Sequence, residues 1–173
     1  MRRNAVSASG GFRRYSRTAL ASVCDVVFVA ALAVGCGGVS QAQSIPFTDH
    51  GSTQQSAYDG PARIAVVTDP AAAGLGELAS RDDGRLYIAA FAGSQRTGGY
   101  EIRVVRVDRA GETLTVRAMF SSPAPGALNI QVLTSPAHLV SIDRKSATGA
   151  RDVVLVDQSA AERARGTVPQ SQP

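Results

Sequence analysis

The chain has 173 residues, of which 44% are hydrophobic and 18% charged, and its formal net charge is +4. Five arginines and one aspartate precede Ala42, so subtracting them from the totals of 18 basic and 14 acidic residues leaves 13 of each sign. A neutral remainder without a basic run argues against electrostatic binding to nucleic acid or to an acidic membrane.

Residues 1–42 have the pattern of a bacterial signal peptide. An arginine-rich start is followed by the apolar run from Val26 to Val34, which is too short for a stable membrane-spanning helix, and then by small residues. Two processing points remain open. Ala33-Val-Gly-Cys36 resembles a lipobox with Cys36 as the lipid-bearing residue, and Ser40-Gln-Ala42 fits ordinary signal peptidase cleavage after Ala42. The sequence therefore predicts an exported protein, either a periplasmic or outer-membrane lipoprotein or a secreted one.

Both cysteines, Cys24 and Cys36, lie in or beside this segment, so the rest of the chain can form neither a disulfide framework nor a cysteine-ligated metal site. About 130 residues remain, enough for one modest core. Residues 43–61 are rich in polar residues and glycine, which predicts a disordered tether. Residues 159–173 are polar again, which predicts a disordered tail and leaves 62–158 as the folded domain.

Within 62–158 the alternation of apolar and polar residues has mostly a period of two, which favours β-strands. The clearest pair is 100–107 and 113–120, joined by a short loop containing Gly111, which predicts an antiparallel hairpin. A change of phase at Val104 and Val105 predicts a bulge in the first strand or burial of both its faces. Further strands are predicted at 62–68, 85–91, 128–134, 138–142 and 152–156.

One short or irregular helix is predicted at 70–80, because Asp69 can cap it and Pro70 suits its first position, whereas two glycines weaken it. We therefore expect a mainly β fold, a small antiparallel sheet or sandwich with at most one short helix. Connections in such a fold gather at the ends of the sheets. This places the turn-rich segment 93–99 at one end, as a simple turn or as a recognition loop.

Three blocks carry a family resemblance: Phe91-Ala-Gly-Ser-Gln-Arg-Thr-Gly-Gly-Tyr100, Ser122-Pro-Ala-Pro-Gly126 and Thr134-Ser-Pro136. In order and spacing they resemble the PrcB C-terminal domain of protease-complex subunits, over roughly residues 85–143. The chain departs from that pattern at Arg96, where proline often stands, and at Ala137 and His138, where an aromatic residue usually follows the proline. The resemblance implies an exported, often lipid-anchored and non-catalytic accessory protein that associates with or stabilises a secreted protease.

The candidate partner-binding residues lie in these blocks: Arg96, Thr97, Gly98, Gly99, Tyr100, Pro125, Gly126 and Pro136. Arg96 could form a two-pronged bond with a carboxylate of a partner. The same order of loops is more distantly similar to chagasin-like inhibitors of cysteine proteases, which leaves inhibition open as an alternative function. A surface lipoprotein of the cell envelope without a protease partner is a further alternative.

The sequence predicts no catalytic, cofactor or metal site. His50 falls in the predicted tether and His138 beside a strand, neither has metal-binding spacing, and a solvated loop histidine is the simplest interpretation. Ser135 near His138 lacks a nucleophile elbow and an orienting acid. Asp82 and Asp83 supply too few oxygens for Ca²⁺ and are predicted to lie in a solvated turn.

Overall fold

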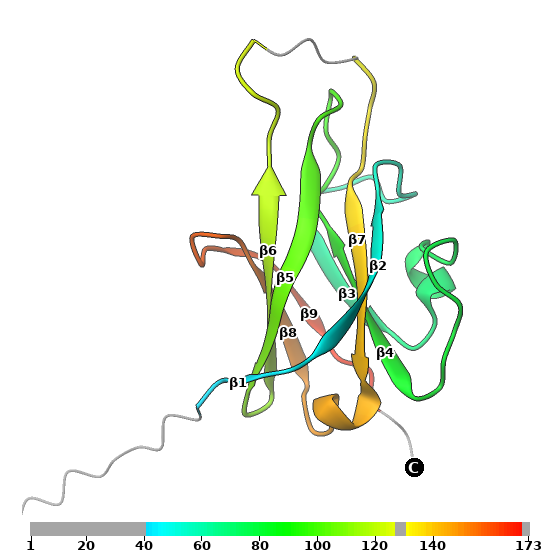
Figure 1. The fold of residues 1–173 in the computed structure, drawn as a ribbon, viewed down its shortest axis with the longest axis vertical. Coiled ribbons are helices and arrows are strands. Elements are labelled where there is room, and N and C mark those ends of the chain that lie inside the picture. Colours follow the sequence, from blue (N-terminus) through cyan, green and yellow to red (C-terminus); the bar gives the residue numbers. More distant parts are fainter. Residues whose placement is uncertain (1–40, 127–130, 171–173) are drawn as a thin grey trace, which may run out of the picture. The chain divides into compact units, whose positions relative to one another are not determined.

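The computed structural model describes residues 41–126 and 131–170. These residues form two β-sheets that pack face to face as a sandwich (Figure 1). The first sheet has the strand order β1-β5-β6-β8-β9 and the second has the order β2-β7-β4-β3. The strands are β1 (Gln43–Ser44), β2 (Phe47–Thr53), β3 (Arg63–Val67), β4 (Arg85–Phe91), β5 (Glu101–Ala110), β6 (Thr113–Ser121), β7 (Ala137–Asp143), β8 (Asp152–Val156) and β9 (Glu162–Thr167).

The predicted hairpin is confirmed as β5 and β6, which pair antiparallel from Glu101 opposite Ser121 to Ala110 opposite Thr113. The register shifts between Val104 and Arg106, where the change of phase predicts a bulge. Every neighbouring pair of strands is antiparallel except β6 and β8, which run parallel. The mainly β fold expected from the sequence is therefore confirmed.

The main core lies between the two sheets. Alternate residues of β4 and β7, among them Ile88 and Val140, face Val107 and Val116 of the hairpin and Leu155 of β8, and all five are fully buried. A second cluster covers the opposite face of β4 and β7. Because this sheet is covered on both faces, its two central strands are almost continuously buried: β4 is apolar after Arg85, whereas β7 also buries the polar residues His138 and Ser141.

The second cluster is covered by the segment that follows β3. There Leu75, which is 2% exposed, packs with Tyr87 and Phe91. The predicted helix is shorter than its candidate range: a 3₁₀-helix, η1, spans Pro70–Ala73, and the Asp69 side chain accepts a hydrogen bond from the Ala71 N–H, as predicted. It ends at Gly74, whose φ of 74° is in the left-handed region. A second 3₁₀-helix, η2, spans Arg144–Ala147.

The predicted tether at 43–61 is wrong, because β1 and β2 lie within it and extend the folded part toward the N-terminus. β1 is an edge of the first sheet and β2 an edge of the second, with the buried Ile45 between them. β2 is held by main-chain pairing with β7 from Phe47 to Thr53, so its polar side chains do not prevent it from ordering.

The predicted tail is also wrong over the residues that the structure describes, because β9 pairs antiparallel with β8. Its side chains alternate between exposed and half-buried, as edge strands allow. The strand predicted at 128–134 is not found at 131–133, Thr134 forms only an isolated bridge with Gln95, and residues 127–130 lie outside the described part.

Candidate partner-binding loop end

Two connections of the sandwich leave it at the same end, because β4 ends there at Phe91, β6 ends there at Ser121 and β7 begins there at Ala137 (Figure 1). We call the described residues 93–99, 122–126 and 131–136 the loop end. It contains residues 93–99 of the first sequence block, which Tyr100 follows directly, and the whole of the second and third blocks. The chain thus brings its candidate binding residues to one end of the fold.

The first and third blocks are joined directly by hydrogen bonds. The Gln95 N–H donates to the Thr134 carbonyl at 2.8 Å, and the Thr134 N–H donates to the Gln95 carbonyl at 2.9 Å. The Thr134 hydroxyl also donates to the Thr97 carbonyl at 3.1 Å. This pairing fixes the loop before β5 against the segment that enters β7.

Residues 54–60 support both blocks from behind. Ser135 exchanges main-chain hydrogen bonds of 3.0 Å with Gln54 and Ser56, and the Ser94 N–H donates to the Gly60 carbonyl at 2.8 Å. Gly93 has a φ of +86°, and a Cβ atom there would lie 2.8 Å from the Pro61 carbonyl carbon. Only glycine can lie this close to the backbone of Pro61, so Gly93 determines the direction in which the loop leaves β4.

The candidate residues differ in accessibility. Arg96, Gly99, Pro125 and Gly126 are exposed, and Thr97, Gly98 and Tyr100 are half-buried. Pro136 is buried, and its carbonyl accepts a hydrogen bond of 2.9 Å from the Ala92 N–H. Pro136 therefore positions the loops, while the exposed residues are free to contact another molecule.

The loop end also presents two apolar side chains that sequence reasoning missed. Val132 is 41% exposed and Leu133 is 69% exposed, the largest exposure among the large hydrophobic residues of the described part. Leu133 borders a hollow of about 160 Å³ next to Tyr58 and Ser94. Sequence analysis assigns both residues to a strand at 128–134, so it does not identify them as exposed. The feature that could have identified them is an apolar pair directly before the block Thr134-Ser-Pro136.

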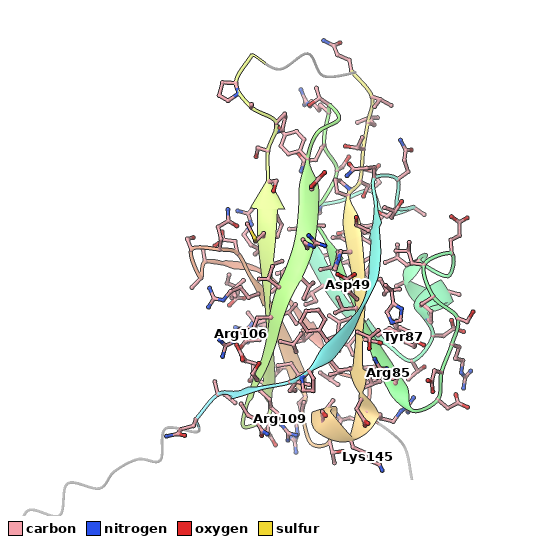
Figure 2. The ribbon with its side chains drawn as sticks, viewed as in Figure 1. Asp49, Arg85, Tyr87, Arg106, Arg109 and Lys145 are labelled. Carbon is pink, nitrogen blue, oxygen red and sulfur yellow. The ribbon has the colours of Figure 1, made fainter. Side chains whose placement is uncertain are left out.

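The prediction that His138 is solvated is wrong. It is 2% exposed, lies in β7, and its Nδ1 accepts a hydrogen bond from the Val104 N–H of β5 at 3.3 Å. Its Nε2 lies 3.2 Å from the Asp49 carboxylate of β2, which Figure 2 shows beside β5. Burial, and after it the charge of Arg103, lowers the pKa of His138, while the Asp49 carboxylate acts in the opposite direction without reversing the shift. Its Nδ1 therefore joins the two sheets, and its Nε2 joins β7 to β2 within the second sheet.

His50 lies in β2 and not in a tether. Its Nε2 is 2.7 Å from the Ser141 hydroxyl, which also accepts hydrogen bonds from Arg85 at 3.1 and 2.9 Å. Burial, followed by the nearby Arg85 guanidinium, lowers the pKa of His50. Ser141 is fully buried, and the His50 ring packs against Tyr87, which Figure 2 shows near Arg85. This arrangement has the features of a structural contact between β2, β7 and β4.

The two aspartates of the turn before β4 are occupied locally. The Asp82 carboxylate accepts from the Gly84 N–H at 2.8 Å, and the Asp83 carboxylate pairs with Arg81 at 2.8 Å. Within 41–126 and 131–170 no group of three or more metal-ligating side chains converges. Over the same residues no helix has the length and apolar character needed to cross a bilayer. Cys36, the candidate lipidation residue, lies outside the described residues.

The fold and its loop end define a class of protein: a small β-sandwich that presents preformed loops at one end. Residues 86–143 match the model of the PrcB C-terminal family, which confirms the family resemblance over this segment. The matched segment runs from β4 to the end of β7 and includes the three blocks of the loop end. Neither a curated protein nor a solved structure matches the chain.

Proposed function

We propose that this protein is an exported, non-catalytic accessory subunit that binds a secreted protease through its loop end. The family match supports association with a protease complex. The single observation that carries the proposed binding site is the hydrogen-bonded pair of loops, from which Leu133 projects with 69% of its surface exposed. Export and an anchor on Cys36 belong to the same proposal and rest on the sequence of residues 1–42.

The loop end has the properties of a protein-binding surface. Its exposed apolar side chains, Val132 and Leu133, and the exposed Arg96 belong to the two segments that the Gln95–Thr134 bridge joins. Interfaces combine an apolar centre with a polar rim in this way, and Arg is enriched in them. Because main-chain hydrogen bonds already hold the two loops, binding orders little further chain, which favours affinity.

The test is a cross-linked pull-down of the tagged protein from intact cells, with partners identified by mass spectrometry. The loop variant carries Arg96→Ala and Leu133→Ser, two positions with exposed side chains. The matched control is Met119→Ser, which removes a 50% exposed apolar side chain from β6, outside the loop end.

We expect a secreted protease to be enriched with the native protein and with Met119→Ser, and to be lost with the loop variant. Recovery of no protease, or equal recovery with all three proteins, would contradict the proposal. The purified protein is then added to the captured protease and to a papain-like protease. Unchanged papain-like activity fits an accessory subunit, whereas inhibition would move the protein into the chagasin-like class.

The anchor is tested separately by growth with a labelled fatty acid. The native protein is expected to incorporate the label and Cys36→Ser to lose it. An unlabelled native protein would contradict lipidation and indicate cleavage after Ala42 instead.

A further inference from the structure

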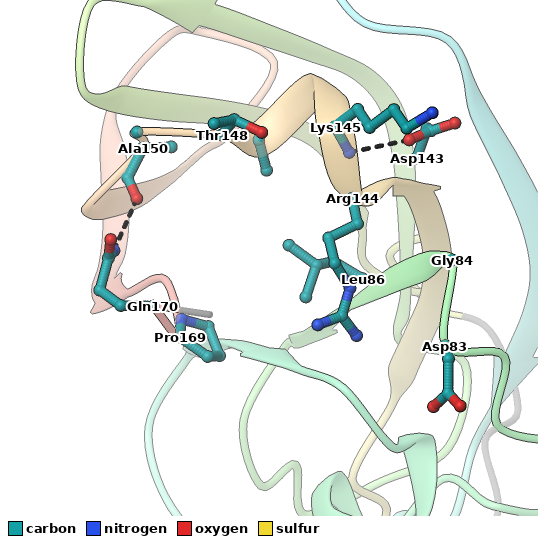
Figure 3. Close-up of a pocket in the computed structure, with 12 residues that line it drawn as sticks. Asp83, Gly84, Leu86, Asp143, Arg144, Lys145, Thr148, Ala150, Pro169 and Gln170 are labelled. Atoms are coloured by element: carbon teal, nitrogen blue, oxygen red, sulfur yellow. Dashed lines mark hydrogen bonds between the residues drawn. The ribbon is translucent and has the colours of Figure 1, made fainter. Parts of the chain in front are cut away.

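The end of the sandwich away from the loop end contains a pocket. β4 begins there at Arg85 and β7 ends there at Asp143. The cavity has a volume of about 600 Å³, within the range of small-molecule sites. Its walls come from the start of β4, from η2 with the turn that follows it, and from Pro169 and Gln170 after β9 (Figure 3).

The pocket has an apolar base. Leu86, Ala147 and Ala150 line it and are themselves between 1% and 5% exposed. On one wall the Gln170 side chain folds back and donates to the Ala150 carbonyl at 2.9 Å and to the Val168 carbonyl at 3.1 Å (Figure 3). The base therefore suits an apolar group, and the wall is held in place before a ligand arrives.

The guanidinium of Arg144 points into this pocket (Figure 3). Its Nε atom is shielded from solvent and has no hydrogen-bond partner, and its Nη2 makes one long bond of 3.4 Å to the Arg85 carbonyl. Such an unsatisfied donor is uncommon in folded proteins and calls for a physical explanation. A guanidinium with unused donors is suited to bind a planar anion.

Two carboxylates, Asp83 and Asp143, border the pocket, but neither is paired with Arg144. Among the described residues it forms no ion pair: Asp83 is paired with Arg81, and Asp143 accepts from the Lys145 N–H at 2.8 Å. Lys145 also borders the pocket, but Figure 3 shows its side chain directed away from the cavity, on the side of Asp143. The pocket thus combines an apolar base with one guanidinium on its wall that forms no ion pair among the described residues.

We propose that this pocket binds a carboxylate attached to an apolar group, with the group on Leu86, Ala147 and Ala150 and the carboxylate on the Nη atoms of Arg144. Two sources share this chemistry: the free C-terminus of a protein segment that ends in an apolar residue, and a small free carboxylic acid. The site is independent of the proposed protease binding, because its residues lie outside the loop end.

Calorimetry on the full exported protein tests the site with four probes: N-acetyl-leucine, its amide, an acetylated Ala-Ala-Leu peptide with a free carboxylate, and the amide of that peptide. At least one free acid is expected to bind about tenfold or more tightly than its amide, the loss expected for a charged hydrogen-bonded pair. Tighter binding of the peptide acid assigns the site to protein C-termini, and equal binding of the two acids assigns it to small carboxylates.

Arg144→Gln is expected to abolish the preference for the acid. Arg144→Lys is expected to retain part of this preference, because lysine keeps the positive charge but lacks the planar guanidinium that binds a carboxylate with two donors. Lys145→Gln is the matched control on the same helix and is expected to retain the preference. Equal binding of acid and amide, absence of binding by all four probes, or an unchanged preference in Arg144→Gln would overturn the proposal. Because the comparison of acid with amide uses the native protein, the test holds even where a variant fails to fold.

Discussion

The imidazole of His138 lies 3.2 Å from the Asp49 carboxylate, and through this pair β7 is joined to the edge strand β2. The other ring nitrogen accepts the Val104 N–H of β5, so the same side chain also reaches the first sheet. A ring that accepts at Nδ1 and donates from Nε2 is the neutral tautomer. Protonation would place a second N–H against the Val104 N–H and remove that hydrogen bond.

We predict that the protein loses stability as the pH falls below about 6.5, the ordinary pKa of histidine. Burial lowers the folded-state pKa of His138, and that of His50 is lowered by burial and by Arg85. A histidine with a lowered folded pKa contributes stability that is complete above its unfolded pKa and is lost as the pH falls toward the folded value. Chemical unfolding followed between pH 8 and pH 5 measures the effect.

The control for this prediction is His138→Gln, which cannot titrate. Its stability is expected to be lower than that of the native protein at pH 8 and to depend less on pH below 6.5. A native protein that is equally stable at pH 8 and pH 5, or a variant with the same pH dependence as the native protein, would contradict the assigned role of His138.

Gly93→Ala is predicted to destabilise the fold by more than about 1 kcal/mol, because the residue has a positive φ and its Cβ would meet the backbone of Pro61 and Ala62. Gly126→Ala is the matched control: its φ is +80°, but no atom lies within 4 Å of the added Cβ. Thermal unfolding should therefore show the larger loss for Gly93→Ala. Equal losses of stability in the two variants would mean that the positive φ alone excludes other residues, and that the close contact at Gly93 adds nothing.

The sequence predicts the central strands well because their side chains carry the signal. β4 and β8 match their predicted ranges, and in β6 the residues Leu114, Val116 and Ala118 are buried as the period of two requires. Phe120 continues that face and packs against the same core, but it is only half-buried because the strand ends there. Alternation therefore locates strands that lie over the core.

Edge strands without an apolar pattern are not found by the same reasoning, whereas the edge strand β3, which is rich in apolar residues, is predicted at 62–68. β2 and β9 contain mainly polar residues, and they are ordered by main-chain pairing with β7 and β8, which no side-chain pattern records. The burial and contacts of His138 could not be predicted for a related reason. His138 and Asp49 are far apart in the sequence, and only the pairing of β2 with β7 brings them together. The loop residues were predictable because glycine and proline mark turns locally, whereas the exposure of Leu133 was not.

Removal of residues before 62 is predicted to abolish folding, although the composition of 43–61 suggests a dispensable tether. The deletion would remove β1 and β2, expose one edge of β7, and take away the support of residues 54–60 behind the loop end. The milder variant Ile45→Ala removes a 5% exposed side chain from the core and is expected to cost about 2–5 kcal/mol. Circular dichroism of the shortened chain and chemical unfolding of the variant are the measurements; a stably folded chain beginning at 62 would contradict the prediction.

Ala160→Gly is predicted to stabilise the turn between β8 and β9, because a left-handed conformation strains residues other than glycine. The gain is limited to about 1 kcal/mol, because glycine loses more entropy on folding. Ala160 has a φ of 66°, the one positive φ of a residue other than glycine among those described. The turn is held by Asp157, whose carboxylate accepts from the Ser159 N–H at 2.9 Å and from the Ala161 N–H at 3.0 Å, so the backbone keeps its conformation in the variant. Ala161→Gly, at the next exposed position, adds the same flexibility without relieving a positive φ and is expected to destabilise. Thermal unfolding of the two variants should shift in opposite directions, and a shared downward shift would show that the strain at Ala160 is smaller than the entropy that glycine loses.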